Sequence, residues 1–273
     1  MHNPAALPRP GRALAVLAAL VVALGAAFVL APLTLAAIRP GGGFAGQRAI
    51  IDALRGAFVQ YWESGSRVFP GSLENVVDYW SGYHVAKALI AALLLVVLVA
   101  LGVRLWKALL RGGGHRAVLL PAWVLVVMLA LSSVVLVTVN VRGAIVPFSS
   151  LVSMLPLGRS NGQLTDVVDQ VRQQLAGSVG SHNPALAVLV GDFARYHAVL
   201  AVLAVIVALV LTGVSVLSWR RFVRAGSADR RVLGSSGVLF ALAALVVIAV
   251  AAANAGTAAD PAPALLAFFN GGS

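Results

Sequence analysis

The chain has 273 residues, of which 60% are hydrophobic and 11% are charged. A soluble domain usually carries about 25% charged residues, and the apolar residues here stand in long blocks, so the composition excludes an ordinary soluble domain. The absence of cysteine excludes disulfides, thiolate metal sites, iron–sulfur clusters and cysteine nucleophiles. The net charge of +11 could indicate a nucleic-acid partner. The cations cluster beside the apolar blocks, however, which is typical of membrane topology, so we expect no nucleic-acid partner.

Five apolar blocks are each long enough to cross a bilayer as a helix, which takes about 20 residues. They cover residues 13–38, 85–106, 117–139, 198–217 and 232–253. The sequence therefore predicts an all-α integral membrane protein with five transmembrane helices.

The first block admits a second interpretation, as a cleaved signal peptide. The tail of residues 1–12 is basic, and small residues, Ala36 and Ala37, stand at the end of the block. The apolar core of a signal peptide is about 7–15 residues long, and this block is nearly twice that. We therefore expect an uncleaved helix.

Two long connections, 39–82 and 140–195, are each predicted to contain an amphipathic helix because apolar residues recur there at helical spacing. The apolar stripes consist of Ile50, Ile51, Leu54, Ala57, Phe58, Tyr61 and Trp62 in the first connection, and of Leu164, Val167, Val168, Val171 and Leu175 in the second. We expect these helices to fold onto their neighbours, with a membrane-surface helix as the alternative. Asn183 followed by Pro184 predicts the start of a helix that runs into the fourth block.

Two stretches of the chain match each other at a fixed offset of 113 residues, as from Tyr83 to Tyr196. The matched pairs are Tyr83/Tyr196, His84/His197, Trp106/Trp219 and Arg111/Arg224, and an aspartate precedes each copy (Asp78, Asp192). Such a period predicts a tandem repeat of a span, an outer amphipathic helix and a second span. The repeat units are 13–116 and 117–231, followed by the fifth span, 232–253, and a Gly/Pro/Ala-rich tail, 254–273. Asn140 and Asn254 close the third and fifth spans, where we expect them to form helix-end hydrogen bonds.

The orientation of the chain across the membrane is predicted from the cations that follow the second and fourth spans. The residues that we assign to the membrane interface and topology are Trp106, Lys107, Arg111, Trp219, Arg220, Arg221 and Arg224. The two tryptophans end their spans, and the short connections that follow are predicted to be basic loops on the cytoplasmic side. The N-terminus is then cytoplasmic, and the long connections and the C-terminal tail lie outside, in the cell (inner) membrane of a bacterium.

His84 and His197 hold equivalent positions at the outer ends of two spans, where they could ligate a haem iron or hold a quinone by hydrogen bonds. The candidate ligand-binding residues are His84, His197, Tyr83, Tyr196, Asp78 and Asp192. The alternative, which we favour, is that the Tyr-His pairs belong to the interfacial aromatic belt. We expect no catalytic residue and no metal ligand, and the Asp–His spacing does not support a dyad within either unit.

The function suggested by elimination is non-catalytic. Apart from Arg104 at the inner end of the second span, Lys87 is the only charge within a span, and the absence of intramembrane acids argues against ion-coupled transport. Motifs for a nucleophile, a phosphate-binding loop or a metalloprotease are missing. We therefore expect an accessory or assembly subunit of a larger membrane complex, with a membrane-protein partner or as a homo-oligomer. The alternatives are a binder of a lipid-like ligand, quinone or haem between the repeats, and a facilitator-type transporter.

Overall fold

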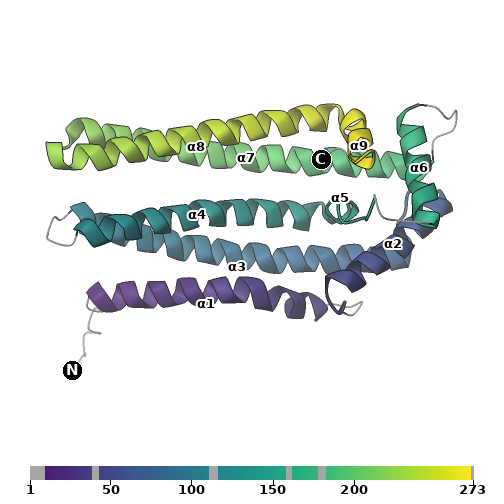
Figure 1. Ribbon diagram of the computed structural model, residues 1–273, viewed down its shortest axis with the longest axis horizontal. Coiled ribbons are helices and arrows are strands. Elements are labelled where there is room, and N and C mark those ends of the chain that lie inside the picture. The colour runs from purple at the N-terminus through teal and green to yellow at the C-terminus, as the bar shows by residue number, and fades with distance from the viewer. Residues whose placement is uncertain (1–9, 39–42, 111–115, 158–161, 178–182, 272–273) are drawn as a thin grey trace, which may run out of the picture. The chain divides into compact units, whose positions relative to one another are not determined.

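The computed structural model describes residues 10–38, 43–110, 116–157, 162–177 and 183–271. The described residues form helices and no strand (Figure 1). The helices are α1 (Pro10–Ala37), α2 (Gln47–Ser64), α3 (Gly71–Leu110), α4 (Arg116–Ile145), α5 (Pro147–Val152), α6 (Gln163–Leu175), α7 (Pro184–Arg224), α8 (Ser227–Ala259) and α9 (Pro261–Phe269).

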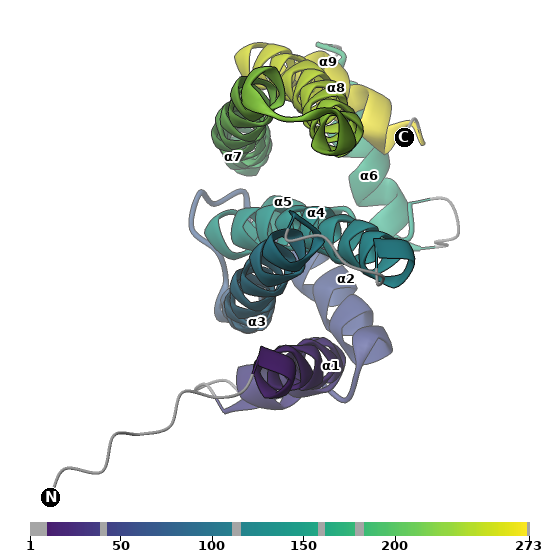
Figure 2. The ribbon, with the colours of Figure 1, turned by 90° about the vertical axis from the view of Figure 1, so that its left-hand side faces the viewer.

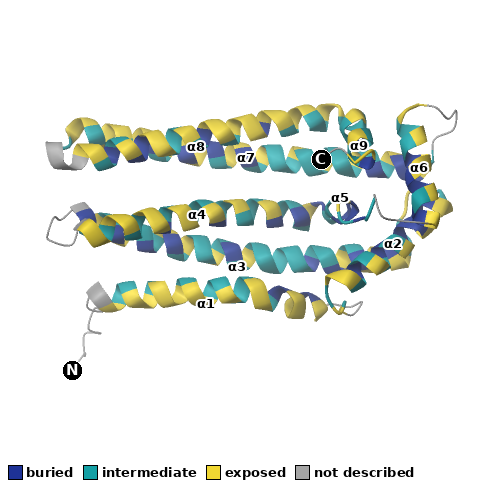
Figure 3. Cartoon of the chain, in the orientation of Figure 1, coloured by how far each residue is buried: buried dark blue, intermediate teal, exposed yellow. Residues whose placement is uncertain are grey.

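Among the described residues, five helices are long and apolar enough to cross a membrane: α1, α3, α4, α7 and α8. Many of their large apolar side chains are exposed, as the yellow segments of these helices in Figure 3 show. Exposed apolar surface on that scale requires an apolar solvent. The prediction of an all-α membrane protein with five transmembrane helices is confirmed, and the tandem repeat stays a prediction.

The chain divides into two compact units, and α1, α3 and α4 contribute to both. The first unit contains residues 1–32 and 85–140, and the second contains 33–84 and 141–273. In the first unit, α3 packs on α4 through a small apolar core and one buried interhelical hydrogen bond, in which Ser133 Oγ donates to the carbonyl of Ala91 over 2.9 Å. The core residues are Leu98, Leu101, Leu105 and Val126, with Leu14, Leu17 and Val21 of α1 packed against them.

In the second unit, α7 and α8 form a tight antiparallel hairpin, seen end-on in Figure 2. Small residues allow the close approach. The hydroxyl of Ser215 donates to the carbonyl of Gly237 over 2.8 Å, and the indole of Trp219 lies where a side chain on Gly237 would stand.

The rest of the second unit is a helical cap, which we define as α2, α5, α6, α9 and the adjoining starts of α3 and α7. Its core is formed by the apolar stripes of α2 and α6 together with residues of the other cap helices, and Leu54, Val171 and Leu265 are completely buried there. Both amphipathic helices are therefore confirmed, and they fold onto neighbouring helices. Trp62 connects them, because its Nε1 donates to Gln170 Oε1 over 2.9 Å.

The start of α7 is also as predicted. Asn183 Oδ1 accepts a hydrogen bond from the backbone N–H of Ala185, and Pro184 is the first helical residue. Asn183 Nδ2 donates to the carbonyl of Trp62 at 2.8 Å, which ties the start of α7 to the end of α2.

Several expectations about the connections were wrong. The basic loop after the fourth span is mostly helical, because α7 continues to Arg224 and α8 begins at Ser227. Trp219, Arg220, Arg221 and Arg224 therefore lie on the last turns of α7, where cations favour the helix C-terminus. Lys107 likewise lies within α3, as does Trp106, which was predicted to end the second span, and Arg111 is outside the described residues.

Asn140 and Asn254 do not end their helices either. Each side chain donates to the carbonyl four residues earlier, Leu136 and Val250, and α4 and α8 continue for at least one more turn. The short helices α5 and α9 were not predicted. Both begin with proline at the first helical position, which was the available signal.

Gly237→Ala is expected to destabilise the α7–α8 hairpin. A methyl group there would lie 2.9 Å from Trp219 Nε1, and overpacking of this kind costs about 1–3 kcal/mol. Gly213→Ala, on α7 with open space around it, is the matched control. Thermal unfolding in detergent should show a lower Tm for Gly237→Ala alone. Equal Tm values for the two variants would contradict the tight packing.

Tyr61 is expected to make the stability of the cap depend on pH. Its side chain is 1% exposed, and its hydroxyl has no hydrogen-bond partner within the described part of the chain. Burial and the nearby charge of Asp192 raise the pKa of Tyr61 from 10.0 to about 12. The pKa of Tyr61 is therefore higher in the folded state than in the unfolded state. The contribution of the protonated hydroxyl to stability is fully present below pH 10 and is lost as the pH rises through about 12.

Tyr61→Phe should therefore lose less stability than the wild type between pH 10 and pH 12, while keeping the ring packing against Phe69 and Phe148. The measurement is Tm at half-unit steps from pH 9 to pH 12.5. Parallel curves for the two proteins would show that Tyr61 ionisation does not oppose folding.

Candidate functional site

The end of α4 contacts both Tyr-His pairs, and the start of α5 bonds to residues close to them in sequence, all within the second unit. Towards α3, the hydroxyl of Ser81 donates to the carbonyl of Ala144, and Trp80 Nε1 donates to Ser150 Oγ, each over 3.1 Å. Towards α7, Arg142 and Ser149 make the contacts described below. This arrangement follows from the chain path, since α4 continues almost directly into α5.

The first pair is packed among aromatic rings and backbone. Tyr83 stacks on Trp80 with ring centroids 5.1 Å apart, and the His84 ring meets Trp80 edge-on at 4.7 Å. A Cβ added to Gly143 would lie 2.8 Å from three atoms of the His84 ring. The imidazole therefore occupies a notch that exists because residue 143 has no side chain.

On the α7 side, Asp192 holds α5 in position. One carboxylate oxygen, Oδ2, accepts hydrogen bonds from both the backbone N–H and the hydroxyl of Ser149, each at 2.8 Å. The residue before α5, Val146, has no side-chain acceptor of its own, so a carboxylate from another helix satisfies this N-terminus. Asp78, which precedes the first Tyr-His pair, is exposed on α3.

The second pair faces different neighbours. The guanidinium of Arg142 lies 4.0 Å from the ring centroid of Tyr196, which is a cation–π contact. His197 Nδ1 lies 2.7 Å from Asn254 Oδ1 on α8. Asn254 Nδ2 donates in turn to the carbonyl of Val250. His197 is thus held in a defined orientation by a hydrogen-bonded chain that ends on the α8 backbone.

A cavity of about 340 Å³ adjoins this second pair. It is lined by residues of α5, its C-cap, α7, the end of α8 and α9, and no charged side chain is among them. The lining residues are Ser149, Val152, Ser153, Leu189, Phe193, Tyr196, His197, Thr257, Ala264, Leu265 and Phe268. The site is therefore mostly apolar, and its polar features are an imidazole, the Tyr196 hydroxyl and three hydroxyl groups of serine and threonine.

Hydrogen bonds from α6 hold α9, which forms one wall of this cavity. Arg172 on α6 donates from Nε to the carbonyl of Phe269 over 2.9 Å, and its Nη2 donates to the same oxygen. Asp169 holds the guanidinium from the other side at 2.7 Å. Because α9 contributes Ala264, Leu265 and Phe268 to the lining, these bonds help to define the cavity.

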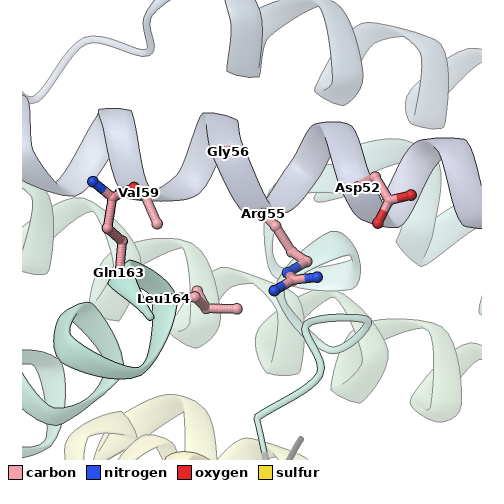
Figure 4. Close-up of a pocket in the computed structure, with 6 residues that line it drawn as sticks. All are labelled: Asp52, Arg55, Gly56, Val59, Gln163 and Leu164. Carbon is pink, nitrogen blue, oxygen red and sulfur yellow. The ribbon is translucent and has the colours of Figure 1, made fainter. Parts of the chain in front are cut away.

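A second cavity of about 310 Å³ lies in the cap between α2 and α6 (Figure 4). It is lined by Asp52, Arg55, Gly56, Val59, Gln163 and Leu164. The Arg55 guanidinium and the Asp52 carboxylate lie apart along α2 (Figure 4). The lining contains one positively charged and one negatively charged side chain, so its charge favours neither an anionic nor a cationic ligand.

The structure thus separates the predicted site residues. Tyr196 and His197 line the larger cavity, and Asp192 acts on it through Ser149, whereas Tyr83 and His84 pack elsewhere and Asp78 is exposed. Sequence reasoning missed Asn254, Thr257, Ser149 and Ser153 as site residues. An asparagine near the end of an apolar span was the available signal for Asn254.

Within the described part of the chain, no group of three or more His, Asp or Glu side chains is arranged to hold a metal ion. Comparison of the chain with protein-family models, with curated proteins and with solved structures gives no match.

Arg172→Gln is expected to loosen α9, because two hydrogen bonds from a charged group to one carbonyl are lost, at a cost of about 1–3 kcal/mol. Hydrogen exchange of the backbone amides in α9 should become about tenfold faster or more. Arg55→Gln changes a cap arginine in the same way without touching α9 and is the control. Unchanged α9 exchange in Arg172→Gln would show that other contacts hold this helix.

Proposed function

We propose that this polytopic membrane protein binds a lipid-like amphipathic molecule in the cavity beside Tyr196 and His197. The observation that carries the proposal is the cavity itself, with its apolar lining and an oriented imidazole at one place in it. Small-molecule sites in proteins typically measure about 300–1,000 Å³ and combine apolar walls with a few well-placed polar groups.

The surroundings suit a ligand that arrives from the bilayer. Leu189, Phe193 and Phe268 give the site aliphatic and aromatic walls, which favour an apolar body in proportion to the area buried. The polar groups come from α5, α7 and α8, so one end of the molecule would be held by hydrogen bonds.

Haem held by both histidines fits this site less well than a lipid-like ligand does. Gly143 lies directly against the His84 ring, so a planar macrocycle could reach that ring only if α4 moved. His197 alone lines the cavity. A quinone-like or other lipid-like ligand fits these contacts better.

The proposed setting is the inner membrane of a bacterium, with the N-terminus cytoplasmic and the C-terminus outside, on the basis of the cations that follow the second and fourth spans. The cap and its cavity would then lie at the outer side. The accessory-subunit role remains a prediction from elimination, as do the partner and the facilitator alternative.

The cavity proposal is tested by filling the cavity. Ala264→Trp places an indole into the lining, whereas Ala267→Trp adds the same group to the exposed face of α9. Lipids that copurify from the native membrane in mild detergent are extracted and quantified by mass spectrometry. We expect a stoichiometric lipid in the wild type and in Ala267→Trp, and a loss of about tenfold or more in Ala264→Trp.

An equal lipid content in all three proteins would contradict the cavity proposal. The same preparation identifies protein partners. A stoichiometric membrane protein that remains bound in both tryptophan variants would instead support the accessory-subunit prediction.

A further inference from the structure

We infer that the ligand of this cavity is an uncharged amphiphile whose head group carries a hydroxyl, and that this hydroxyl donates a hydrogen bond to Nε2 of His197. The inference rests on the proposed function and names the ligand class of the same site. It follows from the direction of the hydrogen bonds around the cavity.

The first step fixes the orientation of Asn254. Its Nδ2 lies 2.8 Å from the carbonyl oxygen of Val250 and donates to it. The reverse orientation of the amide would place Oδ1 against that carbonyl, one acceptor facing another. The oxygen Oδ1 is therefore the atom beside His197.

The second step fixes the tautomer of His197. Because Asn254 Oδ1 can only accept, His197 Nδ1 carries the proton in the 2.7 Å hydrogen bond between them. In the neutral ring, Nε2 then has a free lone pair and is an acceptor. No described side chain or backbone group donates to this atom.

The third step concerns the hydroxyl groups of the lining, whose protons are already used within the protein. Ser149 Oγ donates to Asp192, Ser153 Oγ donates to the carbonyl of Ser150, and Thr257 Oγ1 donates to the carbonyl of Ala253. Each of these oxygens retains only acceptor capacity towards a ligand. The Tyr196 hydroxyl can donate or accept and does not alter the balance.

Apart from the Tyr196 hydroxyl, the polar lining therefore presents acceptors, and a ligand that offers only acceptors would leave them unpaired in an apolar site. The absence of a charged lining side chain disfavours a phosphate or carboxylate head group, whose desolvation would be uncompensated. A hydroxyl head satisfies both conditions. Quinols and diacylglycerol-like alcohols are two kinds of lipid that have such a head.

The experiment compares probes of nearly equal size that differ in the hydroxyl proton. The first pair is decylhydroquinone and decylquinone, titrated without oxygen. The second is 1,2-dioctanoylglycerol and 1,2-dioctanoylpropanediol, in which a hydrogen replaces the hydroxyl. Binding to the purified full-length protein in mild detergent is measured by calorimetry for the wild type, His197→Ala, Asn254→Leu and the matched control His84→Ala.

We expect the wild type and His84→Ala to bind the hydroxyl probe of at least one pair about tenfold more tightly than its partner, and the pair that shows this identifies the kind of lipid. His197→Ala should reduce the ratio to about one while still binding the apolar body. Asn254→Leu should lower the ratio, because the tautomer is no longer fixed.

Equal affinities within both pairs in the wild type, or an undiminished preference in His197→Ala, would overturn the hydroxyl inference and leave the cavity proposal intact. Failure of the wild type to bind any probe would also overturn it. Whether the cavity proposal falls as well is then decided separately, by the lipid content of Ala264→Trp.

Discussion

In the hydrocarbon of a bilayer every backbone N–H and C=O must find a partner within the protein, and the structure depends on this constraint. The five long helices satisfy it internally, so their side chains can be almost entirely apolar. Buried backbone in the cap needs partners as well, and the short helix α5 cannot supply them all, because a helix of six residues consists largely of unpaired ends. It relies on Asp192 of α7, whose carboxylate binds the backbone and the hydroxyl of Ser149. This contact holds α5 in place, and α5 forms one wall of the cavity.

Similar support from outside the helix recurs at α9. The carbonyl of Phe269, near the end of α9, accepts from the guanidinium of Arg172, and Phe269 and Leu265 are buried in the cap core. Both short helices are therefore positioned by side chains distant in sequence. Because the cavity lies against these two helices, its shape is set by polar contacts from α6 and α7 as well as by apolar packing.

The two Tyr-His pairs show that one sequence pattern does not determine one environment. His84 fits against a glycine and a tryptophan, whereas His197 binds an asparagine on α8 and lines a cavity. The difference lies in the neighbours. The second pair has α8 and α9 beside it, and those helices belong to the part of the chain that follows both copies of the pattern. A site can therefore form beside one Tyr-His pair and not beside the other, although the two pairs have the same sequence.

The sequence alone determined the class of protein, its five spans and the two amphipathic helices of the cap, because these depend on local periodicity and on the length of apolar blocks. It also placed the start of α7 at Asn183, since that cap is made within three residues. Only the tertiary structure decided that α5 and α9 exist as helices, that Asp192 caps α5 and that His197 meets Asn254, 57 residues away. These features depend on contacts between segments far apart in the chain. A single sequence does not encode the distance between such segments in any pattern that can be read along it.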